Sequence, residues 1–329
     1  MKKVYTLLLA SITMVVFAQD DSPKLSISGT VDVYGTVNTE DGPGAPGLLI
    51  ATPETANGFG LGMVNTVFSY DGEKSGVVAD LAFGPRADDA NMAGAINQLY
   101  AYYNLTESVT LTAGQFNTFF GYEVISPAAN FNYSVSYLFN AGPFSHTGLK
   151  LDYAASEDLS LMLAVTNGHA ITSDIPNPSG ETQFGAQVGY KGQFLNFIYG
   201  GVSPGIDDGL LIDYTGGFDL TDSFYVGINA AYSYSEDDEA AGYQGAALYL
   251  QNSFSDSLAI GLRPEFFSLT YDESDDEDVT ALTLTGNYTL DSNLTFIAEL
   301  RYDDSEDGII EGYPGEDLST LTFAAVYSF

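Results

Sequence analysis

The 329-residue sequence has no cysteine, no tryptophan and few cations. Without cysteine, the chain cannot form disulfides, use a thiol in catalysis or carry a lipid on an N-terminal cysteine. Lys and Arg together number 9 against 44 Asp and Glu, which gives a formal net charge of −35 at pH 7. Because a chain of this charge repels polyanions, nucleic acid is excluded as a partner.

Long hydrophobic runs are also missing after residue 18. The N-terminus carries two lysines, then an apolar stretch from Leu7 to Phe17 that ends in small residues. This order predicts a secretory signal peptide over residues 1–18 that is cleaved from the mature chain. An uncleaved membrane anchor would need an apolar run of about 18 residues or more. We therefore expect a single mature domain over residues 19–329.

Apolar residues occupy every second position through much of the chain. The first example runs from Leu25 through Ile27 and Gly29 to Val37, with Ser, Thr, Asp and Tyr between them. This period of two predicts β-strands that have one apolar and one polar face. About 16 such segments follow one another to the C-terminus, and no stretch after the signal shows a sustained helical period.

The connections between these segments alternate between short and long. Short examples are residues 71–74, 106–108 and 191–192, and long ones are residues 38–58 and 117–146. Short periplasmic turns and long external loops are typical of outer-membrane barrels, and lipid does not tolerate an unpaired sheet edge. The predicted fold is all-β, a transmembrane antiparallel up-and-down barrel of about 16 strands around a lumen too wide for side chains to fill.

Particular stretches resemble a known family. The chain ends in Tyr327-Ser328-Phe329, which resembles the terminal strand signal of outer-membrane barrels. The stretch from Gly114 to Glu123, followed by residues 142–148 and 165–168, resembles the OmpL-like β-barrel porins, and residues 77–91 fit the same family. The resemblance implies a porin-like barrel over the mature chain, and it supplies no catalytic residues.

The third long loop, residues 117–146, is the longest connection. It follows the fifth predicted strand, where 16-stranded porins carry a loop that folds inward. We therefore expect an inward-folded third external loop that constricts the pore, with an ordinary external loop as the alternative. Its rings either pack the loop against the wall or form a track on which sugar rings and apolar faces stack. The candidate rings are Phe119, Phe120, Tyr122, Phe131, Tyr133 and Tyr137.

Few charged residues are candidates for setting ion selectivity. They lie in the third loop or on the polar face of the strands, where they would line the pore. The alternative is that four of them, Arg263, Glu265, Glu299 and Arg301, pair with one another and stiffen the wall. Pairing and ion selectivity are compatible roles. The last three external loops carry many acids without Lys or Arg, which predicts a preference for cations. The candidate pore-lining residues are Glu123, Lys150, Asp152, Arg263, Glu265, Glu299 and Arg301.

Signals for metal binding and catalysis are weak. Asp303 and Asp307 match the first half of a calcium loop, but Pro314 stands where the bidentate Glu would be, so we predict no specific metal site. The two histidines, His146 and His169, belong to no nucleophile motif. The sequence predicts no enzyme and no cofactor.

These observations together predict an outer-membrane porin of a Gram-negative bacterium. It would form a water-filled channel for passive diffusion of small solutes and ions, with cations preferred. Its surroundings would be outer-membrane lipid and lipopolysaccharide, and a homotrimer is left open. The alternatives are a surface adhesin or structural barrel whose lumen the third loop closes and, behind it, an outer-membrane hydrolase.

Overall fold

The structure is a computed structural model, and it describes residues 24–38, 57–90, 94–168, 182–201, 209–235, 242–271, 275–305 and 317–329. The predicted signal peptide, residues 1–18, lies outside the described residues, so its cleavage stays a prediction.

Sixteen antiparallel strands form one closed barrel in chain order, with β1 paired to β16. This confirms the predicted all-β antiparallel barrel and its strand number. The strands are β1 (Lys24–Asn38), β2 (Asn57–Asp71), β3 (Ser75–Phe83), β4 (Ile96–Asn104), β5 (Val109–Asn117), β6 (Ser145–Ala154), β7 (Leu159–Asn167) and β8 (Thr182–Tyr190). The second half of the ring is β9 (Gln193–Gly200), β10 (Gly209–Asp219), β11 (Phe224–Ser235), β12 (Gly242–Ser253), β13 (Leu258–Thr270), β14 (Glu277–Thr289), β15 (Leu294–Asp304) and β16 (Asp317–Ser328).

The two faces of the strands differ as the alternation predicts. On β1, Leu25 is 67% exposed and Ile27 55%, whereas Asp32 is 2% exposed. The same arrangement, with large apolar side chains outside and polar ones buried inside, recurs around the ring. A protein in water would place its apolar side chains in the core. The reversed pattern belongs to a barrel whose outer face contacts lipid.

The chain ends close the ring. Gly29 and Phe329 exchange two backbone hydrogen bonds, each 3.0 Å long, between the first strand and the last residue. The absence of a side chain on Gly29 makes room for the Phe329 ring, which a β-carbon at Gly29 would overlap. With this pair in place no strand edge is left open, as an apolar environment requires.

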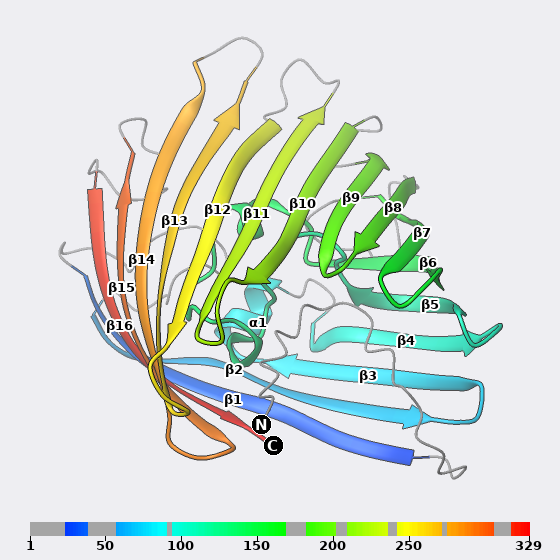
Figure 1. Ribbon diagram of the computed structural model, residues 1–329, viewed down its shortest axis with the longest axis horizontal. Helices are drawn as coiled ribbons and strands as arrows, with labels where there is room; N and C mark the ends of the chain where they lie inside the picture. Colours follow the sequence, from blue (N-terminus) through cyan, green and yellow to red (C-terminus); the bar gives the residue numbers. More distant parts are fainter. Residues whose placement is uncertain are drawn as a thin grey trace.

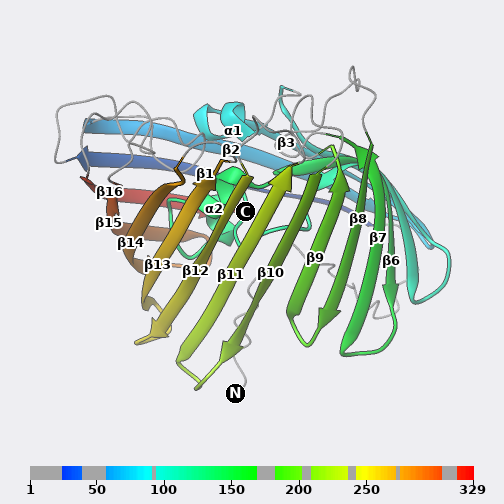
Figure 2. The same cartoon turned by 90° about the horizontal axis from the view of Figure 1, so that it is seen from above.

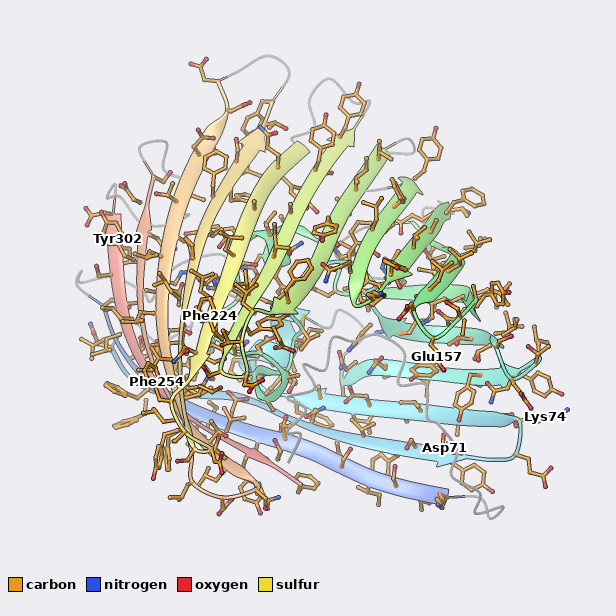
Figure 3. The ribbon with its side chains drawn as sticks, viewed as in Figure 1. Asp71, Lys74, Glu157, Phe224, Phe254 and Tyr302 are labelled. Atoms are coloured by element: carbon orange, nitrogen blue, oxygen red, sulfur yellow. The ribbon has the colours of Figure 1, made fainter. Side chains whose placement is uncertain are left out.

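The strands are strongly tilted. In Figure 1, β1 to β5 run across the view while β9 to β14 run upward, so opposite parts of the wall cross at a large angle. Seven connections of two to four residues join strands at one end of the barrel, which we call the short-turn end. In Figure 3 the labelled Lys74 and Glu157 mark two of these turns. The predicted short connections are confirmed.

In the part of the chain that the structure describes, helices are few and short. They are α1 (Pro85–Ala90), the 3-10 turn η1 (Pro127–Ala129) and α2 (Tyr137–Ala141). Figure 2 shows α2 beside the barrel strands in the view from above. Ser136 caps α2, because its side chain accepts a hydrogen bond from the Phe139 N–H at 3.1 Å. A helix of five residues is too short to show a helical period in the sequence. Among the described residues, none of the helices has the length and apolarity to cross a membrane.

Candidate functional site

Residues 118–144, which we call the β5–β6 segment, join β5 to β6 and contact strands far from both. The Asn132 side chain donates to Thr285 of β14 at 2.6 Å, and the Gly121 N–H donates to Asp213 of β10 at 3.1 Å. In a ring of sixteen strands, β14 lies nine positions from β5 in one direction and seven in the other. Both acceptors are buried on the inner face of the wall. The segment therefore packs against the inner face of the wall opposite its own strands.

Carboxylates on the wall accept hydrogen bonds from the backbone of the segment. Glu299 of β15 accepts from the N–H groups of Tyr133 and Ser134, at 2.8 and 3.0 Å. Glu265 of β13 accepts from the N–H of Leu138 at 3.0 Å. Hydrogen bonds to a charged acceptor are stronger than those between neutral groups. These carboxylates satisfy backbone donors that have no strand partner.

The three arginines of the chain converge on the same stretch of the segment. Arg86 of α1 donates to the carbonyl of Tyr133 at 2.9 Å. Arg263 of β13 and Arg301 of β15 both donate to the carbonyl of Val135, at 3.2 and 2.8 Å. A guanidinium offers five donors in a rigid plane, which suits it to several backbone carbonyls at once. Residues 133–138 are thus held by cations through carbonyls and by carboxylates through N–H groups.

Two buried ion pairs complete this arrangement. Arg263 pairs with Glu123 of the segment, and Arg301 pairs with Asp303 of its own strand at 2.8 Å. Glu123 also accepts from the Ser136 N–H at 2.6 Å. Buried pairs are stable only when further hydrogen bonds satisfy both partners, as they do at Glu123. Arg263 therefore pairs with Glu123 of the segment. It does not pair with Glu265 or Glu299 of the wall, contrary to the alternative of mutual pairing.

The structure separates the predicted pore-lining charges into two groups. Five of them, Glu123, Arg263, Glu265, Glu299 and Arg301, are buried, with Arg263 fully covered. Lys150 and Asp152 of β6 form a pair at 3.3 Å, and their side chains keep 21% and 12% exposure. Parity along a strand shows that a side chain points inward, but it does not show what covers that side chain.

The rings of the segment mostly pack against the wall. Tyr122 stacks on Tyr249 of β12 with ring centroids 3.9 Å apart, and Tyr137 stacks on Phe267 of β13 at 5.9 Å. Burial raises the pKa of the Tyr122, Tyr133 and Tyr137 phenols above the ordinary tyrosine value. Four of the six candidate rings are buried, namely Phe120, Tyr122, Tyr133 and Tyr137, whereas Phe119 and Phe131 are half-buried.

Wall glycines make room for the side chains of the segment. A β-carbon at Gly227 of β11 would overlap the Tyr122 ring, and one at Gly261 of β13 would overlap the Phe131 ring. The sequence alone does not reveal these contacts, because a glycine within a strand has several explanations. The signal that could have shown them is the position of these glycines on the inward-facing side of their strands. The other two pairs are Gly185 with Phe119 and Gly245 with Leu138.

Asp213 of β10 is a buried carboxylate of the wall that the sequence analysis did not single out as a site residue. It accepts hydrogen bonds from the side chains of Asn196 and Asn229, in addition to the Gly121 N–H. Donors from three directions offset the cost of burying the charge without a cation. Asp213 therefore anchors the start of the β5–β6 segment.

Of the residues considered for metal binding or catalysis, the structure describes Asp303 and His146. Asp303 is engaged by Arg301, and Asp307 lies outside the described residues. Among the described residues no cluster of three or more His, Cys, Asp or Glu could hold a metal ion. His146 is buried, lies 3.0 Å from the Thr118 hydroxyl and stacks on Phe119. His169 is also outside the described residues.

Comparison with protein families identifies the chain. The family described as "Putative beta-barrel porin-2, OmpL-like" matches residues 24–329. The chain belongs to this porin family. The match covers the whole barrel, so the protein is an outer-membrane β-barrel protein of the porin type, as the resemblance of residues 114–123 implies. No curated protein sequence matches the chain.

Solved porin structures share the fold of this porin-family barrel. The anion-selective porin from Comamonas acidovorans has a TM-score of 0.64 and 11% identity, covering 94% of this chain and 100% of that one. The outer membrane channel DcaP of Acinetobacter baumannii has a TM-score of 0.63 and 14% identity, covering 95% and 99%. OmpT of Vibrio cholerae in its trimer form has a TM-score of 0.61 and 10% identity, covering 94% and 100%. At these identities the likeness concerns the fold alone.

Proposed function

We propose that this porin conducts small solutes and ions passively, with the β5–β6 segment folded into the lumen as its constriction. The observation that carries this proposal is the fixed position of the segment against the inner face of β10 to β15. On the other side of the ring, inner side chains of β4 and β6 stay half-exposed, among them Tyr100, Tyr102, Lys150 and Asp152. Solutes would pass along this part of the wall.

The proposed channel prefers cations. The three arginines are buried under the segment, and Lys150 is neutralised by Asp152. The half-exposed Asp71, which accepts a hydrogen bond from the Tyr102 hydroxyl, adds a carboxylate near the short-turn end. The net charge of −35 acts in the same direction, because acidic surfaces concentrate cations. The anion-selective porin from Comamonas acidovorans shares this fold, so the fold does not decide whether cations or anions are preferred. Local charges must decide it.

No enzymatic role is proposed, since His146 is enclosed between rings and a hydroxyl, away from solvent. The apolar outer face would contact outer-membrane lipid, and its rim lipopolysaccharide. A homotrimer is consistent with the trimer form of the OmpT structure that shares the fold.

Planar-bilayer recording of the refolded chain over residues 19–329 tests the proposal. We expect stable open steps and, in a tenfold KCl gradient, a reversal potential that is shifted from zero toward the K⁺ equilibrium potential. A shift toward the Cl⁻ equilibrium potential would refute the cation preference. Silence from a barrel that is folded and heat-modifiable on gels would refute the channel and favour the alternative, in which the segment closes the lumen of an adhesin or structural barrel.

A further inference from the structure

A cavity of about 360 Å³ lies inside the barrel at the short-turn end. Its wall comes from residues near the ends of β12, β14, β15 and β16, and residues 127–131 of the β5–β6 segment form the opposite side. Phe224, which Figure 3 labels at the start of β11, also borders it. The volume falls in the range of small-molecule pockets, roughly 300 to 1,000 Å³. None of the arginines that hold the segment lines it.

Uncharged polar residues are the most numerous class in the lining. Phe131, Ile297 and Val326 are among the apolar residues beside them, and no Lys or Arg is among the lining residues. Two carboxylates, Asp219 and Asp222, border the cavity and are exposed, so an anionic solute would be repelled at its edge. Hydroxyls and amides both donate and accept hydrogen bonds, which suits a solute that carries many hydroxyls. The polar lining includes Asn130, Gln251, Ser253, Asn287, Thr289 and Thr295.

The Phe131 ring is held in place from behind. Gly261 of β13 provides the space that the ring occupies, because a β-carbon there would overlap it. The Asn287 side chain donates to the Phe131 carbonyl at 2.8 Å, which fixes the backbone at the same residue. A ring that is already positioned binds a solute without the entropic cost of ordering it. Phe131 thus supplies a rigid apolar surface on which a sugar ring can stack.

We propose that this cavity binds a neutral sugar of one or two rings. The apolar face of the sugar packs on Phe131, and its hydroxyls exchange hydrogen bonds with the amides and hydroxyls of β12 and β14. The carboxylates at the edge exclude acidic sugars. This inference rests on the proposed channel function, since it names a class of solute that crosses the barrel and pauses at its short-turn end.

Two measurements on the refolded chain over residues 19–329 test the site. Calorimetric titration in detergent measures binding of sucrose, the neutral probe, of the acidic sugar glucuronate and of the cationic amino sugar glucosamine. Current recording in planar bilayers measures block by the same solutes. We expect sucrose to bind and to block, and glucuronate to bind at least tenfold more weakly.

Two variants remove the Phe131 surface in different ways. Phe131→Ala deletes the ring, and Gly261→Ala pushes it out of its position; each should weaken sucrose binding at least tenfold while the open steps persist. The matched controls are Phe296→Ala, whose ring is exposed on the outside of β15, and Gly286→Ala, where a β-carbon has no neighbour closer than 4.0 Å. Both controls should bind sucrose as the unaltered chain does.

The outcomes separate the site from the channel. Open steps without sucrose binding would overturn the sugar site and leave the channel intact. Sucrose binding without any current would support the site and overturn the channel. Glucosamine binding tenfold tighter than sucrose, or glucuronate binding as tightly, would overturn the neutral-sugar assignment. Equal loss of binding in the matched controls would also overturn it.

Discussion

Lys150 and Asp152 form an ion pair on the inner wall whose side chains keep partial contact with water. Lys150 also lies 5.3 Å from the centre of the Phe116 ring, which limits its movement. The other candidate selectivity charges are buried among protein groups. At the scale of single residues, burial distinguishes a charge that acts on solutes from one that holds the chain.

Replacement of Lys150 tests this distinction. Lys150→Met should increase the preference for cations, because Asp152 is left without its partner beside the proposed path. The measurement is the reversal potential in a KCl gradient. Lys191→Met is the matched control, since Lys191 pairs with Asp158 at 3.6 Å between two neighbouring short turns, where both side chains are more than half exposed. Equal reversal potentials in the Lys150 variant and the unaltered chain would contradict the prediction.

The buried tyrosines of the segment make stability sensitive to alkaline pH. Burial raises the pKa of Tyr122 above that of an unfolded tyrosine, about 10. The unfolded chain therefore loses its phenol protons first. The stability that the buried, protonated Tyr122 phenol contributes to the folded state is fully present below pH 10 and is lost as pH rises through the folded-state pKa. Chemical unfolding between pH 8 and 11 should show this decline, and Tyr122→Phe should reduce it. A decline as steep in Tyr122→Phe would count against the role of this phenol.

The β5–β6 segment is the element whose position depends on tertiary contacts alone. It has one α-helix of five residues, one 3-10 turn and no strand pairing between Asn117 and Ser145, so wall side chains supply hydrogen-bond partners for its backbone. The ring of strands is held separately by ladders between neighbours. Loss of an anchor should therefore loosen the segment and leave the barrel closed.

Arg263→Met tests the strongest anchor. It leaves the Glu123 carboxylate buried without its cation, a change that costs roughly 3–5 kcal/mol when one partner of a buried pair is removed. We expect new protease cleavage within residues 118–144 and noisier current, with the barrel still heat-modifiable on gels. Adding Glu123→Gln should restore part of the protection, because the uncompensated charge is then gone. Cleavage unchanged from the parent chain would show that Arg263 is not an anchor.

At the scale of the whole molecule, folding depends on closure of the ring between β1 and β16. Phe329→Ala removes the ring that packs over Gly29, although it keeps the two backbone hydrogen bonds. We expect a clearly lower yield of heat-modifiable barrel on refolding, since loss of the ring contact weakens the joint between β1 and β16, and a chain that fails to close exposes an edge that is costly in an apolar environment. Phe254→Ala, in the exposed turn between β12 and β13, is the control. A normal yield from Phe329→Ala would rule out a role for this ring in closure.

The sequence by itself determined the barrel. A period of two along each segment assigns every side chain to one face, and alternating short connections make neighbouring strands antiparallel. Strand number, the inward position of Arg263 and Glu299, and the outward position of Leu25 all follow from that local pattern and agree with the structure.

Only the tertiary structure decided what the inward side chains contact. Arg263 and Glu123 are 140 residues apart in the chain, and no local period relates them. The segment covers one part of the inner wall and leaves Lys150 and Asp152 in contact with water, a choice made by hydrogen bonds and glycine spaces distributed over several strands. Contacts between distant parts of a chain depend on how its elements pack, and for that reason the pattern that predicts the barrel does not predict its pore.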